Sequence, residues 1–188
     1  MVRHHVAAAL LAVAAGVGGD AGPHRAPMRH EPDPSALRSG DLVFRIGRGW
    51  RADVVRILSR DSLSHVGLVD VAADGVHVIH AAPPGDGYAG GVERITLAVF
   101  AAVEAASGVV AYRRTDLDTD AQDKIVTVAR RLALLRVPFD DAFDLGDGRA
   151  VDCTELVVRA SAEAGVPLRD HIDGNRFRAL RRNVPDAS

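Results

Sequence analysis

Residues 65–81 read HVGLVDVAADGVHVIHA, and this stretch decides the fold into which the rest of the chain must fit. Two runs rich in β-branched residues, 65–71 and 76–81, are separated by four residues that end in Asp74-Gly75. Asp-Gly between two such runs is a strong signal for a β-hairpin. The sequence therefore predicts two antiparallel strands joined by a short turn.

The register of this hairpin predicts which histidines meet. If the loop 72–75 closes the hairpin, His80 lies opposite Gly67, and His65 lies on the same face two residues away. His65 and His80 are then diagonal neighbours at about 7–8 Å between backbones, within reach of two imidazole rings. A three-residue turn would send His80 to the other face. His77 is three residues from His80 and is expected on the opposite face, partly exposed.

Outside the hairpin, strands and helices do not alternate regularly. This irregular order argues against a doubly wound parallel sheet and predicts an α+β domain. Residues 83–91 hold four glycines and two prolines, which indicates a loop. Periodicity and capping signals predict strands over 41–46 and 109–113 and helices over 50–59, 96–106, 119–136 (capped by Thr119) and 152–164.

The N-terminal residues are predicted not to belong to this domain. Residues 1–21 combine Arg3, an apolar run over 6–17 and small residues near Ala21, which is typical of a secretory signal peptide. The apolar run is 12 residues long, whereas a membrane span needs about 20. An amphipathic N-terminal helix is the alternative. We expect a linker over 22–34, one domain over 35–188, and a mature protein that is secreted or periplasmic, without a stable membrane span.

Composition excludes several classes of protein. The formal net charge is −2, and the pI of 6.4 offers no basic surface for nucleic acid. The single cysteine, Cys153, excludes an intramolecular disulfide and a cysteine-rich zinc site. A mixed histidine and cysteine metal site would need ligands scattered along the chain. The sequence therefore predicts no cofactor, no metal and no nucleic-acid partner.

The most informative short segment is Asp152-Cys153-Thr154-Glu155, which has the form of a capping box ahead of an apolar run. If Asp152 caps the helix, Cys153 is its first residue, where the helix dipole lowers the pKa of a thiol. The alternative is that Cys153 is a small buried hydrophobe. A thiolate nucleophile needs a base and a group that orients the base. His65 and His80 are the candidates, and His171 lies in a polar stretch typical of the surface.

These residues, taken in order, resemble the YiiX/YaeF-like enzymes, the circularly permuted branch of the NlpC-type, papain-like cysteine hydrolases. The resemblance runs from about residue 38 to 168. It implies a permuted papain-like fold, with Cys153 as the nucleophile, His65 as the general base and His80 as the third polar residue. The segments that carry it are Gly40-Asp41-Leu42-Val43-Phe44, Ser64-His65-Val66-Gly67, Ile79-His80-Ala81, Phe139-Asp140, Phe143-Asp144 and Asp152-Cys153-Thr154-Glu155-Leu156-Val157.

Two positions depart from the pattern of that branch. Permuted members commonly have Glu in place of His80, and often an aromatic residue in place of Asp152. Unpermuted cell-wall peptidases have Asp-Cys-Ser-Gly, with the Asp near the free amine of the substrate. Asp152 is therefore either a substrate-binding carboxylate or only the helix cap. Asp41 is expected to be structural.

The resemblance implies an exported thiol amidase or endopeptidase that acts on bacterial cell-wall peptides. We expect the Cys153 sulfur about 3–4 Å from a ring nitrogen of His65, and the Cys153 backbone N–H as an oxyanion donor. One alternative is a lipid or acyl-ester hydrolase or acyltransferase, with the loop 83–91 lining an acyl groove. A further alternative is a non-catalytic binding module.

Overall fold

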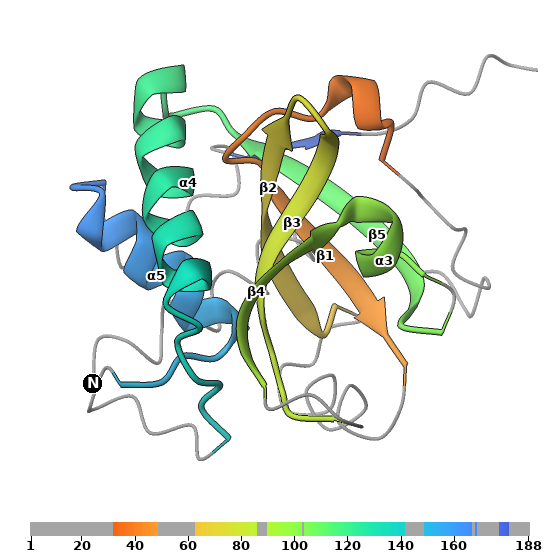
Figure 1. The fold of residues 1–188 in the computed structure, drawn as a ribbon. Coiled ribbons are helices and arrows are strands. Elements are labelled where there is room, and N and C mark those ends of the chain that lie inside the picture. Colours follow the sequence, from red (N-terminus) through yellow and green to blue (C-terminus); the bar gives the residue numbers. More distant parts are fainter. Residues whose placement is uncertain are drawn as a thin grey trace, which may run out of the picture.

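Six strands form one antiparallel sheet in the order β4-β3-β2-β1-β5-β6 (Figure 1). The computed structural model describes residues 32–48, 63–85, 90–102, 104–141, 149–166, 168 and 177–180. The predicted signal peptide 1–21, the helix 50–59 and His171 lie outside these ranges. The strands are β1 (Leu42–Gly47), β2 (His65–Ala72), β3 (Gly75–Ala82), β4 (Gly91–Thr96), β5 (Ala106–Arg114) and β6 (Phe177–Leu180).

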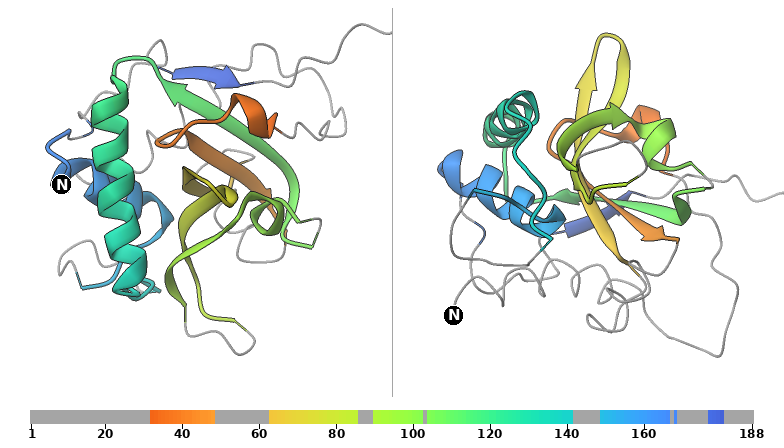
Figure 2. Two further views of the ribbon diagram at one scale, coloured as in Figure 1. Left: turned by 45° about the horizontal axis from the view of Figure 1, so that its top comes forward. Right: turned by 60° about the horizontal axis from the view of Figure 1, so that its bottom comes forward.

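Helices cover both faces of the sheet. The short η1 (Pro34–Ala36) precedes β1, α3 (Leu97–Phe100) follows β4, and the long helices are α4 (Thr119–Leu134) and α5 (Cys153–Glu163). Figure 2 shows α4 and α5 together on one side of the sheet and α3 on the other. Alternation along the strands gives each face its own apolar core. Leu42, Leu68, Ile79, Ile125, Leu132 and Leu156 lie in the core under α4 and α5; Val43, Val69, Val78, Leu97 and Phe100 lie in the core under α3.

The structure is α+β, as the sequence predicts, and the hairpin has the predicted register. Val71 pairs with Val76, so the same pairing continued along β2 and β3 places His80 opposite Gly67. The ladder runs one pair further than expected, to Ala72 and Gly75, but that does not change which side chains share a face.

Four features along the chain differ from the prediction. The segment after the glycine-rich loop forms β4, which the sequence analysis missed, because the single pair Val92 and Ile95 gave too little alternation to identify a strand. The helix expected over 96–106 is only α3, and β5 already starts at Ala106. Asp118 rather than Thr119 caps α4, since its side chain accepts a hydrogen bond from the N–H of Ala121. The strand β6 was not predicted.

Asp41 is structural, as expected. Its carboxylate is fully buried and accepts two hydrogen bonds from Arg113, from Nε at 2.8 Å and from the terminal nitrogen at 2.7 Å. The backbone N–H of Arg38 donates a third at 2.8 Å. These bonds join the turn before β1 to β5, and a buried carboxylate with this many donors is fully satisfied.

A second buried carboxylate, Asp70, ties the sheet to α4. Arg94 Nε donates to its Oδ2 at 2.6 Å, and Arg130 Nε donates to its Oδ1 at 3.1 Å. Burial raises the pKa of Asp70, but the hydrogen bonds and charges of Arg130 and Arg94 outweigh it, so the net shift is downward. The carboxylate is therefore held ionised between β2, β4 and α4.

We predict that Asp70→Asn lowers the free energy of unfolding by about 2 kcal/mol at pH 7. Breaking a buried pair usually costs more, but both arginines are partly exposed, so solvent screens the loss. Because the pKa of Asp70 is lowered by folding, its contribution is complete above the unfolded carboxyl pKa of about 4 and is lost as the pH falls below it. The difference between wild type and variant, measured by urea unfolding, should therefore shrink from pH 5 to pH 3.

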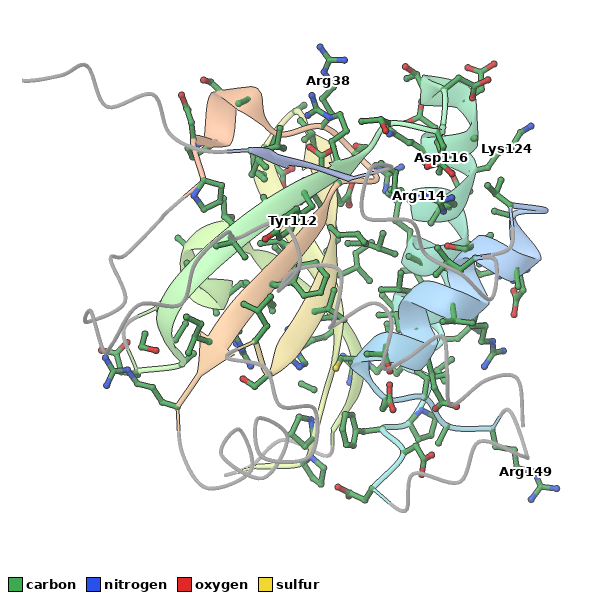
Figure 3. The ribbon with its side chains drawn as sticks, turned by 180° about the vertical axis from the view of Figure 1, so that it is seen from behind. Arg38, Tyr112, Arg114, Asp116, Lys124 and Arg149 are labelled. Carbon is green, nitrogen blue, oxygen red and sulfur yellow. The ribbon has the colours of Figure 1, made fainter. Side chains whose placement is uncertain are left out.

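The matched control is Asp116→Asn. Arg114 and Asp116 lie beside each other at the end of the sheet near the start of α4 (Figure 3), and the Asp116 side chain is 22% exposed, whereas Asp70 is fully buried. Such a pair contributes less than about 1 kcal/mol to the free energy of unfolding. A loss at Asp70 no larger than the loss at Asp116 would contradict the structural role of Asp70.

Candidate active site

The first helical residue of α5 is Cys153, as the sequence predicts. Asp152 is the N-cap, and its Oδ1 accepts hydrogen bonds from Thr154 N at 2.6 Å, Thr154 Oγ1 at 2.7 Å and Glu155 N at 2.8 Å. Glu155 Oε2 accepts from the backbone N–H of Asp152 at 3.1 Å, which completes the capping box. The cap fixes where α5 starts and thereby holds the thiol at the end of the helix that faces the sheet.

His65 and His80 meet as the hairpin register predicts. His65 Nε2 lies 2.8 Å from His80 Nδ1, a hydrogen bond between two rings set at 89°. Gly67 makes this contact possible, because a Cβ there would lie 2.4 Å from Val78 Cγ1 and 3.2 Å from His80 Cβ. Both imidazoles are nearly covered, with His65 8% and His80 2% exposed.

His77 lies on the opposite face, as predicted, but it is buried rather than partly exposed. Arg94 packs against its Nδ1 at 3.0 Å, and Asp74 lies 3.5 Å from its Nε2. These contacts belong to the ion pairs around Asp70, so His77 has no part in the site.

The thiol meets β2 where that strand begins. The Cys153 sulfur is hydrogen-bonded to the backbone at Val66, the residue next to His65. α5 packs in the core on one face of the sheet, whereas the His65 ring stacks on Phe100 of the core on the other face; the thiol contacts β2 at Val66, next to His65. The expected distance of 3–4 Å between the sulfur and the His65 ring stays a prediction.

Three residues at the site were missed by the sequence analysis. Arg45 is paired with His65 across β1 and β2, and its charge acts on both Cys153 and His65. Phe100 of α3 stacks on His65 with ring centres 5.9 Å apart. Arg45 Cζ lies 4.9 Å from the centre of the Phe100 ring. Glu93 of β4 lies opposite His80, with Oε1 3.1 Å from Nε2. Strand pairing brings Arg45 and Glu93 to the histidines, packing of α3 on the sheet brings Phe100, and no local motif marks any of the three.

Burial makes the thiol and the base electrically neutral. It lowers the pKa of His65 well below the ordinary value, and the nearby Arg45 and His80 lower it further. Burial also raises the pKa of the Cys153 thiol to about 12, helped by the Asp152 carboxylate and opposed by backbone hydrogen bonds and Arg45. The expectation of a lowered pKa for Cys153 is therefore wrong: desolvation outweighs the effect of the helix start.

Comparison with known proteins supports the fold. No protein-family model matches the chain, and no curated protein matches it. Among solved structures, a chain described as the metalloprotein YiiX from Escherichia coli O157:H7, DUF1105, matches with a TM-score of 0.55 and 22% sequence identity. The match covers 68% of this chain and 66% of that one, slightly under two thirds of the YiiX chain. The chain has a YiiX-like fold.

The two facing nitrogens of the histidine pair are not placed to share a metal ion. Nε2 of His65 and Nδ1 of His80 are directed at each other, so their lone pairs cannot converge on a common ion. Within the described residues, no group of three His, Cys, Asp or Glu side chains is placed to hold a metal.

Among the helices of the described residues, none is long and apolar enough to cross a membrane.

We predict that Asp152→Asn lowers the pKa of the Cys153 thiol while leaving the helix cap intact. All three capping hydrogen bonds go to Oδ1, which an asparagine also provides, so the free energy of unfolding should change by less than about 0.5 kcal/mol. Loss of the carboxylate charge removes one of the two causes that raise the pKa of the thiol.

The measurement is the rate of iodoacetamide alkylation against pH, followed by mass spectrometry. The rising limb of the variant should lie at lower pH than that of the wild type. Asp118→Asn at the cap of α4 is the control, since it makes the same change far from the thiol. An unchanged profile in Asp152→Asn would show that the Asp152 charge does not act on Cys153.

Proposed function

We propose that this protein is an exported cysteine amidase or endopeptidase with a permuted papain-like fold, acting on bacterial cell-wall peptides. The observation that carries the proposal is the pair of buried, hydrogen-bonded imidazoles His65 and His80 at the strand end where the Cys153 thiol meets β2. A nucleophile, a base and a group that orients the base are the parts such a reaction needs.

In the proposed reaction the Cys153 sulfur attacks the amide carbonyl while His65 takes the thiol proton. Nε2 of His65 is bonded to His80, so the accepting atom is Nδ1. Because the thiol pKa is high and the imidazole is neutral, proton transfer accompanies the attack instead of preceding it. The backbone N–H of Cys153 donates to the tetrahedral oxyanion.

The intermediate collapses by breaking the carbon–nitrogen bond, and the His65 imidazolium gives its proton to the leaving amine. Water then attacks the thioester, with its proton passing to His65. The carbon–sulfur bond breaks, the sulfur takes the proton back, and the acid product leaves. Arg45, whose charge acts on the thiol, favours negative charge at the sulfur throughout.

Substitutions at the three residues test this reaction on purified peptidoglycan digests. Cys153→Ala should abolish turnover with little change in the melting temperature, and His65→Ala should lower kcat by about 100-fold or more. His80→Ala should cost about 10-fold, because it removes only the orientation of His65. Retained turnover in Cys153→Ala would refute covalent catalysis by this thiol. Equal losses at the two histidines would mean that their roles are misassigned.

The Asp152 carboxylate supports a peptide substrate with a free amine over a lipid or an acyl ester. A negative charge beside the nucleophile opposes thiolate formation, so it has a catalytic cost that only a cationic substrate offsets. Asp152→Asn should therefore raise KM several-fold for amine-bearing stem peptides. It should leave p-nitrophenyl esters and phospholipids nearly unaffected.

Assays on the two substrate classes compare the variant with the wild type. An equal effect on both classes would reduce Asp152 to a helix cap. Turnover of esters but not peptides would favour the lipid or acyl-ester activity. Turnover of neither would favour a binding module.

A further inference from the structure

The ring nitrogens of the two histidines allow two proton arrangements, and only one suits catalysis. If His80 donates from Nδ1, His65 accepts at Nε2 and carries its own proton on Nδ1, where it cannot act as a base. If His80 instead accepts at Nδ1, His65 donates from Nε2 and keeps a lone pair on Nδ1. The 2.8 Å distance is the same in both arrangements.

Glu93 provides the asymmetry that selects between them. It lies directly opposite His80 in the ladder between β3 and β4, with Oε1 3.1 Å from His80 Nε2. The contact is close but not aligned as a linear hydrogen bond, and no other acceptor reaches Nε2 among the described residues. A carboxylate only accepts, so it favours a proton on Nε2 of His80. Nδ1 of the same ring is then an acceptor.

The charges around His80 come from two elements. Burial lowers the pKa of His80 most, Glu93 of β4 raises it and Arg45 of β1 lowers it, and the net shift is downward. Glu93 also acts on Arg45 and stabilises its charged form. With an exposed fraction of 30%, Glu93 lies at the rim, where a carboxylate keeps part of its hydration while it contacts a ring that is 2% exposed.

We propose that Glu93 is a positioning residue that sets the protonation of the site: it holds a proton on His80 Nε2, His65 then donates from Nε2 to His80, and His65 Nδ1 is left as the base. This inference rests on the proposed function for the meaning of that base. The proton arrangement itself exists whether or not the protein cleaves anything. Glu93 and His80 together do what a single carboxylate does when it contacts the base directly, by fixing its tautomer.

The experiment reads the tautomers directly, by nitrogen-15 NMR of the histidine rings in the full chain. In the wild type, His65 and His80 should each show a protonated Nε2 and an unprotonated Nδ1. Glu93→Leu removes the acceptor and should convert a large part of both rings to the Nδ1-protonated form. Glu93→Gln keeps an acceptor oxygen without the charge, so it should retain the wild-type tautomers while the pKa of His80 falls.

Activity on the peptidoglycan digest gives the second readout. Glu93→Leu should lower kcat by up to about 10-fold, the loss expected for His80→Ala, because Glu93 acts through His80; Glu93→Gln should lower kcat less, and KM should stay nearly unchanged in both. Glu104→Leu and Glu104→Gln, at an exposed glutamate in the turn before β5, are the matched controls and should behave like the wild type. If Glu93→Leu does not fold, the titration of His80 in Glu93→Gln decides.

The outcomes separate this inference from the proposed function. Wild-type tautomers in Glu93→Leu, or an unchanged pKa of His80 in Glu93→Gln, would overturn the role of Glu93 even in an active enzyme. Altered tautomers together with activity that survives Cys153→Ala would support the role of Glu93 and overturn the proposed function.

Discussion

The register between β2 and β3 is the constraint on which the rest of this structure depends. Side chains alternate along a strand, so a slip of one residue would exchange the two faces of the hairpin. In the observed register His65 and His80 share one face with Gly67 between them, while Asp70 and His77 point to the other. One pairing thus builds both the candidate site and the ion pairs that hold α4.

Those two sets of polar residues are stabilised in different ways. Asp70 is buried as a charge and is satisfied by two arginines from different elements. The histidines are buried as neutral rings, since desolvation and the Arg45 charge both oppose protonation. The ion pairs of Asp70 hold α4 against the sheet. The neutral histidine rings have protons that can move, which is what acid–base chemistry needs.

Burial also shapes the candidate nucleophile. A helix start favours a thiolate, but Cys153 is half-buried against the core beneath α5 and lies beside the Asp152 carboxylate. Asp152, which caps the N-terminus of α5, therefore also opposes ionisation of the thiol. Arg45 and the hydrogen bond from the strand backbone partly offset this effect. The balance leaves a neutral pair whose proton moves only when a substrate carbonyl is attacked.

The sequence by itself determined the elements whose signals are local. The Asp-Gly turn fixed the hairpin register and hence the His65–His80 contact, and the capping box fixed the start of α5 at Cys153. These features follow from neighbours within a few residues, where turn and capping chemistry act.

Only the tertiary structure decided what surrounds those groups. Glu93 reaches His80 through a ladder to a strand with no clear sequence signal, and Arg45 and Phe100 come from β1 and α3. The pKa of Cys153 was predicted in the wrong direction for the same reason. A helix dipole can be inferred from sequence, but the loss of solvent around a side chain depends on what packs against it, and those residues lie far away in the chain.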